Sequence, residues 1–128
     1  MKDFFTVSAA IELGAGVALL AFPSAAVKLL LGSPLDTPAA VALGRLAGAA
    51  LLTLGIACWR ARGDVQSRAA RGLVIEMLIY NLAAVAVIVS VGLGGTLVGK
   101  LLWPAVALHV VMAIWCVRDL IVSGEKRQ

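Results

Sequence analysis

Charged and polar side chains within long apolar runs are the residues of this sequence that could do chemistry. The stretch "RGLVIEMLIYN" (residues 71–81) shows the pattern, because Glu76 has apolar residues on both sides. If these runs cross a membrane, such groups are costly there and usually face a bundle interior or water, where they serve proton relays or ion pathways. The candidate residues are Glu12, Arg45, Glu76, Tyr80, Asn81 and His109.

The two carboxylates lie at similar depth in their apolar runs. With a helical rise of about 1.5 Å per residue, Glu12 lies about 12 Å and Glu76 about 9 Å from the starts of their segments. Two close carboxylates would share a proton and titrate as a pair, which would suit a proton or cation site. The alternative is that each carboxyl is protonated or hydrogen-bonded to a neighbouring helix.

A second polar layer, formed by Arg45 and His109, lies nearer the other side of the predicted bundle. Each residue is about 8–10 Å from the start of its segment. The long Arg45 side chain could extend along the helix to the lipid headgroups. Alternatively, its guanidinium could contact an anion or a lipid headgroup, or pair with a carboxylate. A direct pair with Glu76 would need helix tilt or a water. Gly44 and Gly48 form a GxxxG beside Arg45 and mark the side of that helix that can approach another backbone.

Soft metal ligands occupy one face of the last apolar run. His109, Met112 and Cys116 are spaced i, i+3, i+7 and could suit copper. Because His109 and Cys116 are about 10 Å apart along the axis, a site would need ligands from other helices, such as Cys58. Haem would need a second axial ligand, since the chain has one histidine. The alternative is that His109 forms a hydrogen bond to the backbone or to Asn81, and that Met112 and Cys116 serve only in packing. No resident cofactor is therefore predicted.

The elements that must position these residues are membrane helices. The chain has 128 residues, of which 62% are hydrophobic and 14% charged, whereas soluble domains average roughly 45–50% apolar residues. A soluble domain of this size could not hide so much apolar surface. Four segments reach the length of about 20 residues that a bilayer requires. We therefore predict one all-α domain over residues 1–128, an integral four-helix transmembrane bundle. The spans are about 4–22, 38–59, 70–91 and 104–122, with an interfacial helix at about 23–31.

The distribution of basic residues predicts the orientation of the bundle. Eight of the eleven Lys and Arg residues lie at the chain ends or near the second loop, "RARGDVQSRAAR" (60–71), and three lie toward the opposite side. The positive-inside rule then places both termini in the cytoplasm of a bacterial inner membrane. Trp59 and Trp103 fall at span ends, as interfacial aromatics do. The short "MKD" and Glu12 argue against a cleaved signal peptide. The basic residues form no stripe, so the net charge of +4 does not indicate nucleic-acid binding.

Three segments resemble the DoxX-like group of small four-helix bacterial membrane proteins. They are a first span that ends in Pro before "LLLGSP" (29–34), the stretch "LGRLAGAALLTLGIACW" (43–59), and an Asn-bearing third span followed by "WPAVALHVVMAIW" (103–115). The resemblance implies the four-helix fold. For some members it also implies an accessory role beside quinone-linked oxidoreductases, which makes a quinone a candidate cofactor beside haem and copper. It carries over no catalytic residue.

Sequence motifs of common enzymes are missing, among them GxSxG, HExxH, the P-loop and GxGxxG. We therefore expect a non-catalytic accessory or scaffold subunit of a membrane complex. A small proton-coupled transporter or channel that uses the intramembrane carboxylates is one alternative, and a redox or metal-handling subunit is another. Beyond the lipid bilayer, the expected partners are copies of the chain or a larger complex. The reason is that the helix faces rich in Gly and Ala are more extensive than the contacts among four short helices require.

Overall fold

Residues 1–125 are described by the computed structural model, and every regular element in this range is an α-helix. Four of the helices are long and apolar enough to cross a bilayer, so the predicted all-α, four-span membrane protein is confirmed. Lys126 and Arg127, which entered the charge argument, lie outside the described residues. The helices are α1 (Lys2–Ala21), α2 (Pro23–Leu31), α3 (Pro38–Ala61), α4 (Arg68–Leu93) and α5 (Leu102–Glu125).

Local signals in the sequence set the helix ends. The Thr37 side chain accepts a hydrogen bond of 3.1 Å from the Ala40 amide, and Pro38 occupies the first turn of α3, where its missing N–H costs nothing. Ser67 caps α4 in the same way, through the Ala70 amide at 3.0 Å. The short helix α2 ends at Gly32, whose φ of 84° suits glycine because a Cβ would be strained there. The short predicted helix after the first span is therefore also present.

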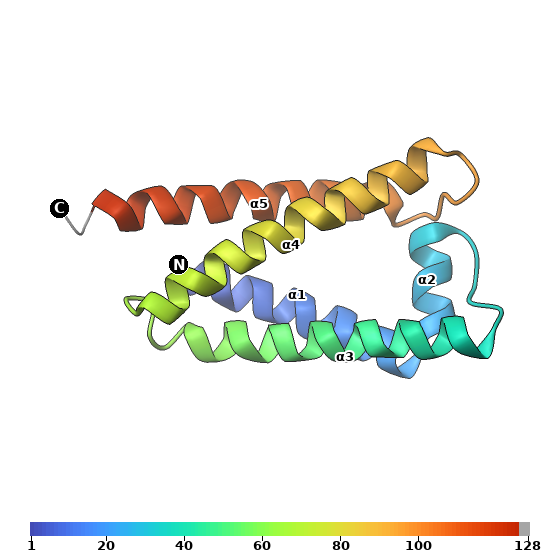
Figure 1. Ribbon diagram of the computed structural model, residues 1–128, viewed down its shortest axis with the longest axis horizontal. Coiled ribbons are helices and arrows are strands. Elements are labelled where there is room, and N and C mark those ends of the chain that lie inside the picture. The colour runs from blue at the N-terminus through green and yellow to red at the C-terminus, as the bar shows by residue number, and fades with distance from the viewer. Residues whose placement is uncertain (126–128) are drawn as a thin grey trace.

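The long helices form two pairs. α1 packs along α3 and α4 packs along α5, whereas contacts between the two pairs are sparse (Figure 1). α2 runs across the long helices at one end of the molecule and contacts α1, α3 and α5. The start of α1 and the end of α5 lie at the opposite end, which is called the terminal end below (Figure 1). The cytoplasmic placement of this end, in a bacterial inner membrane, stays a prediction.

The α1–α3 pair is held by a close approach of two backbones. A Cβ on Gly16 would lie 2.7 Å from the backbone nitrogen of Leu52, and a Cβ on Gly48 would lie 2.9 Å from the carbonyl oxygen of Gly16. Small residues allow such contact where van der Waals packing holds membrane helices together. The GxxxG therefore marks a close seam at Gly48, while Gly44 faces the Leu35 side chain instead. Because this seam lies within one chain, it does not by itself require a second copy.

A packed core fills the terminal end of the bundle. It joins both helix pairs, because its members come from α1, α3, α4 and α5. The two cysteines are free thiols within it. The core residues are Phe4, Phe5, Ala9, Cys58, Ala70, Val74, Met77, Met112 and Cys116.

Candidate ligand site within the helix bundle

A cavity of about 300 Å³ lies between the two helix pairs, beyond the packed core. All five helices contribute to its wall. Three of the lining side chains are polar: Glu12, Tyr80 and His109. The apolar remainder of the wall consists of Ile11, Ala15, Leu19, Leu30, Leu51, Ala84, Val87, Ile88, Ala105 and Leu108. This mixture of an apolar wall with a few grouped polar atoms is typical of small-molecule sites.

Glu12 is the carboxylate of this cavity. α1 carries it on the same face as Gly16, and the close approach of α1 to α3 leaves only 3% of its surface exposed. The Tyr80 side chain, from α4, lines the same cavity and is a polar neighbour of the Glu12 carboxyl group. A buried polar group needs such a neighbour, because leaving it without one is costly. The helices α1 and α4, which belong to different pairs, thus meet through polar side chains.

His109 is oriented by Asn81. The Nδ1 of His109 lies 2.8 Å from the Oδ1 of Asn81, and the Nδ2 of Asn81 donates to the carbonyl oxygen of Met77 at 2.7 Å. Since the amide oxygen can only accept, Nδ1 carries the proton. The Tyr80 ring packs edge-on against the imidazole, with ring centroids 5.7 Å apart. Asn81, one of the two partners that the sequence allowed for His109, is therefore a positioning residue.

The polar layers predicted from depth are assembled only in part. Glu12, Tyr80 and His109 come together, with Asn81 behind His109. Glu76 is exposed on the outer surface of α4 and does not line the cavity. Of the two alternatives for the carboxylates, a shared two-carboxylate site is not what this arrangement provides. The reason is the rotation of α4: Met77 and Asn81 face the interior, and Glu76 projects about 140° away from Asn81 around the helix.

Arg45 also lies outside the cavity. It is exposed on the surface of α3, where its stem is free to extend along the helix. Within residues 1–125, neither Arg45 nor Glu76 forms an ion pair. The predicted pairing of Arg45 with a carboxylate is therefore not observed within this chain.

The cavity continues into a second, wholly apolar hollow of about 160 Å³ between α1 and α2. Ala15, Leu19 and Leu30 line both spaces, so the two adjoin. The cavity also reaches the outer surface, because Val87 is 62% exposed and Leu108 is 40% exposed. In a bilayer this surface faces hydrocarbon, which gives an apolar molecule a lateral route to the polar groups.

The four residues considered as possible metal ligands are not gathered in one place. Among the described residues, no group of three or more His, Cys, Asp and Glu side chains is placed to hold a metal ion. Cys58, Met112 and Cys116 lie in the packed core, whereas His109 lines the cavity. The three sulfur side chains therefore serve in packing, and they do not join His109 in one donor set.

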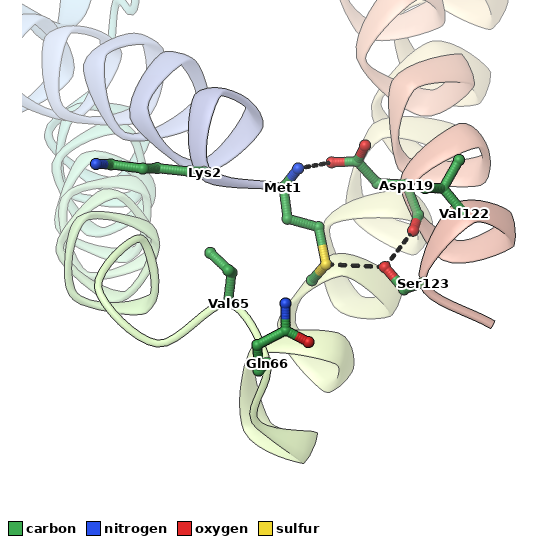
Figure 2. Close-up of a pocket in the computed structure, with 7 residues that line it drawn as sticks. All are labelled: Met1, Lys2, Val65, Gln66, Asp119, Val122 and Ser123. Atoms are coloured by element: carbon green, nitrogen blue, oxygen red, sulfur yellow. Dashed lines mark hydrogen bonds and ion pairs between the residues drawn. The ribbon is translucent and has the colours of Figure 1, made fainter. Parts of the chain in front are cut away.

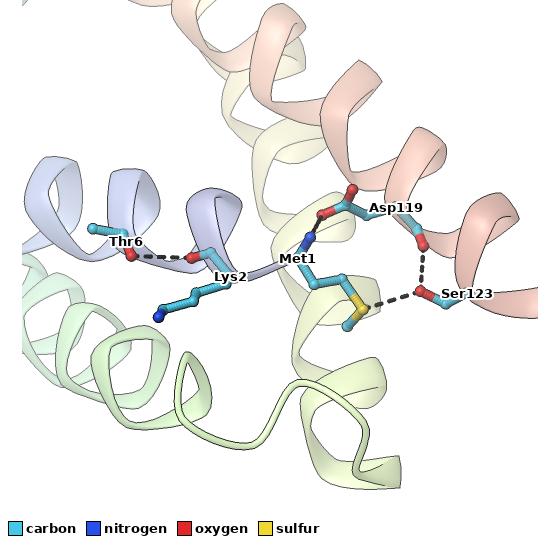
Figure 3. Close-up of polar contacts among 5 residues, drawn as sticks. All are labelled: Met1, Lys2, Thr6, Asp119 and Ser123. Carbon is cyan, nitrogen blue, oxygen red and sulfur yellow. Dashed lines mark hydrogen bonds and ion pairs between the residues drawn. The ribbon is translucent and has the colours of Figure 1, made fainter. Parts of the chain in front are cut away.

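A second polar cluster closes the terminal end of the bundle. The Met1 α-amino group forms an ion pair of 2.8 Å with the Asp119 carboxylate (Figure 2). The Ser123 hydroxyl lies 2.6 Å from the Asp119 carbonyl oxygen, to which it donates, and 3.0 Å from the Met1 sulfur (Figure 3). A pocket of about 180 Å³ lies beside this cluster. Because Met1 precedes α1 and Asp119 lies on α5, the cluster links the two helix pairs.

Sequence reasoning missed two parts of these sites. Ser8 is buried one turn before Glu12, and its hydroxyl has no hydrogen-bond partner among the described residues. Its i, i+4 spacing from Glu12 was a signal that could have revealed it. Tyr80 was a candidate, but its place beside Glu12 was missed, because depth along the helix matched Glu12 with Glu76, one turn before Tyr80 on α4.

Comparisons of the chain with protein-family models, with curated proteins and with solved structures find no match. The resemblance to DoxX-like proteins therefore extends to the four apolar helices, and no family match supports it further.

Proposed function

We propose that this small multi-pass membrane protein binds an apolar molecule inside its bundle and acts as a non-catalytic subunit. One observation carries the proposal: the cavity of about 300 Å³ whose apolar wall holds Glu12, Tyr80 and His109. The cavity opens toward the surface that faces the bilayer, so an apolar molecule dissolved in the lipid can enter it and contact its wall.

The wider role that we propose is that of an accessory subunit within a membrane complex. The exposed Glu76 on α4 supports this role, because a carboxylate that faces hydrocarbon is costly without a partner. Purification from native membranes in mild detergent tests it. A stoichiometric partner protein is expected, and a homogeneous preparation without one would contradict the accessory role.

The placement of the two carboxylates does not support the transporter alternative. It required two carboxylates in one space, whereas Glu12 lines the cavity and Glu76 faces outward. Of the two carboxylates, only Glu12 remains a candidate for proton exchange inside the bundle. We therefore propose ligand binding, and not transport, as the function of the cavity.

Photolabelling tests the binding proposal. The probe is dodecane bearing a diazirine, in lipid nanodiscs, because the photoproducts of alkyl diazirines react with carboxyl groups. We expect Glu12 to be modified and unlabelled dodecane to reduce its labelling. Ala84→Phe fills the cavity and should remove most of the Glu12 label. Ala86→Phe, on the exposed side of the same helix, is the matched control and should leave the label unchanged.

Glu76 supplies the internal reference for this measurement. It is exposed on α4 in the isolated chain, so the probe should label it to the same extent in both variants. Glu12 labelling that is equal in the two variants, or labelling confined to Glu76, would overturn the proposed cavity site.

A further inference from the structure

We infer that the cavity selects an amphiphile whose head group is a hydroxyl, an alcohol or a phenol, and whose tail is apolar. The inference rests on the proposed function and adds the chemical class of the ligand. It follows from the hydrogen-bonding character of the three polar side chains and from the shape of the adjoining space.

The imidazole of His109 offers an acceptor to the cavity. Asn81 holds the proton on Nδ1 through the 2.8 Å contact with its amide oxygen. In the neutral ring, Nε2 then carries a lone pair and accepts hydrogen bonds. Asn81 occupies Nδ1 from outside the cavity wall, so Nε2 is the ring nitrogen of His109 that is left for a ligand in the cavity. A ligand at this edge must therefore donate.

Glu12 supplies a second acceptor to the same region. A carboxyl group offers an acceptor oxygen in both of its protonation states. Tyr80 lines the same cavity as Glu12 and packs against His109, so the three polar side chains lie in one region of the wall. A hydroxyl head can donate to one of these groups and accept from the Tyr80 hydroxyl. A ketone, an ether or an ester lacks the donor.

The apolar tail has a defined direction. The second hollow, between α1 and α2, adjoins the cavity through Ala15, Leu19 and Leu30 and contains no charged side chain in its wall. A chain that leaves the polar groups along Leu19 would pass into this hollow and then toward α2. The cavity of about 300 Å³ suits a six-membered ring as the head.

Competition against the diazirine probe tests the selection for a donor. The two competitors are 4-hexylphenol and its methyl ether, 4-hexylanisole, compared at equal mole fraction in the nanodisc lipid. They differ in that a methyl group replaces the hydroxyl proton, which removes the hydrogen-bond donor and keeps the ring and the alkyl tail. We expect the phenol to compete with the Glu12 label about tenfold better, which corresponds to about 1.4 kcal/mol. Equal competition by the two compounds, or competition by neither, would overturn the inference.

The failure of this inference can be told apart from the failure of the proposed function. If the Glu12 label responds to Ala84→Phe but not to the head group of the competitor, the cavity binds apolar molecules without selecting a donor. If the label does not respond to Ala84→Phe, the cavity site itself is wrong.

A spectroscopic measurement avoids substitutions at the buried positions. His109 is the single histidine of the chain, so ¹⁵N-histidine labelling reports on it alone. We expect the proton on Nδ1 in the free protein, and a shift of the Nε2 resonance when 4-hexylphenol is added but not when the ether is added. A proton on Nε2 in the neutral ring, or equal shifts with both compounds, would overturn the proposal.

Discussion

The two halves of the bundle are built from the same helices but are packed differently. At the terminal end, aromatic and sulfur side chains such as Phe4, Met77 and Cys116 fill the space between the helix pairs. In the other half, small residues such as Ala15, Ala84 and Ala105 face one another, and a hollow is left. The packed half joins the helices, and the open half holds the polar groups.

The difference shows how a bundle this small can hold a carboxyl group inside a membrane. Glu12 lies where the packed core gives way to the cavity, so the core and the α1–α3 seam shield it while Tyr80 provides a polar neighbour. Membrane helices gain little from apolar burial, and van der Waals packing at the closed end has to hold them together. A site can then be left open in the other half.

The largest expected effect comes from the α1–α3 seam, on which both halves depend. Gly16→Leu forces the backbone of α1 away from Leu52, since even a Cβ would lie 2.7 Å from its nitrogen. We expect a loss of at least about 3 kcal/mol in the free energy of unfolding, measured by steric trapping in bicelles. Gly14→Leu, on the same helix with nothing within 4 Å, is the control and should be neutral or slightly stabilising. Equal destabilisation by both variants would contradict the seam.

A matched pair of valines on α4 tests the contrast between the halves directly. Val74 is fully buried in the packed core, whereas Val87 lines the open half and is largely exposed. We expect Val74→Ala to cost about 1.5 kcal/mol through lost packing, and Val87→Ala less than about 0.5 kcal/mol, in the same unfolding assay. If the two substitutions cost the same, the halves do not differ in packing.

The ion pair at the terminal end should contribute less than the core. Asp119→Asn leaves the Met1 ammonium without its carboxylate partner at 2.8 Å. Because the pair is mostly shielded, we expect a loss of about 1 kcal/mol in stability. The photolabelling of Glu12 should not change, since the cavity lies in the other half. A change in Glu12 labelling without a change in stability would show that the two halves are coupled.

The smallest effect is expected at the surface of the packed half. The Arg62 guanidinium lies 3.3 Å from the centroid of the Trp59 ring. Arg62→Gln removes this cation–π contact and should cost about 0.5 kcal/mol in the free energy of unfolding. Arg60→Gln, at the exposed neighbouring position, serves as the control and should have no measurable effect. A larger loss from Arg60→Gln would show that overall basic charge, and not the ring contact, stabilises this end.

The helices could be predicted from the sequence because their signals are local. The apolar runs set the number of spans, and residues such as Thr37, Pro38 and Gly32 act on the turns next to them. The close helix approach at Gly48 could also be predicted, because only small residues permit it. These features need no knowledge of which helix lies beside which.

Which polar groups meet was decided by the tertiary structure alone. Depth along the helix matched Glu12 with Glu76, but the rotation of α4 against α5 turned Glu76 outward and brought Tyr80 to Glu12. Helix rotation follows from the packing of core residues such as Val74 and Met77, whose partners come from distant parts of the chain. A span's own residues specify its length and its apolar character, whereas the composition of a site between helices depends on how all of them pack together.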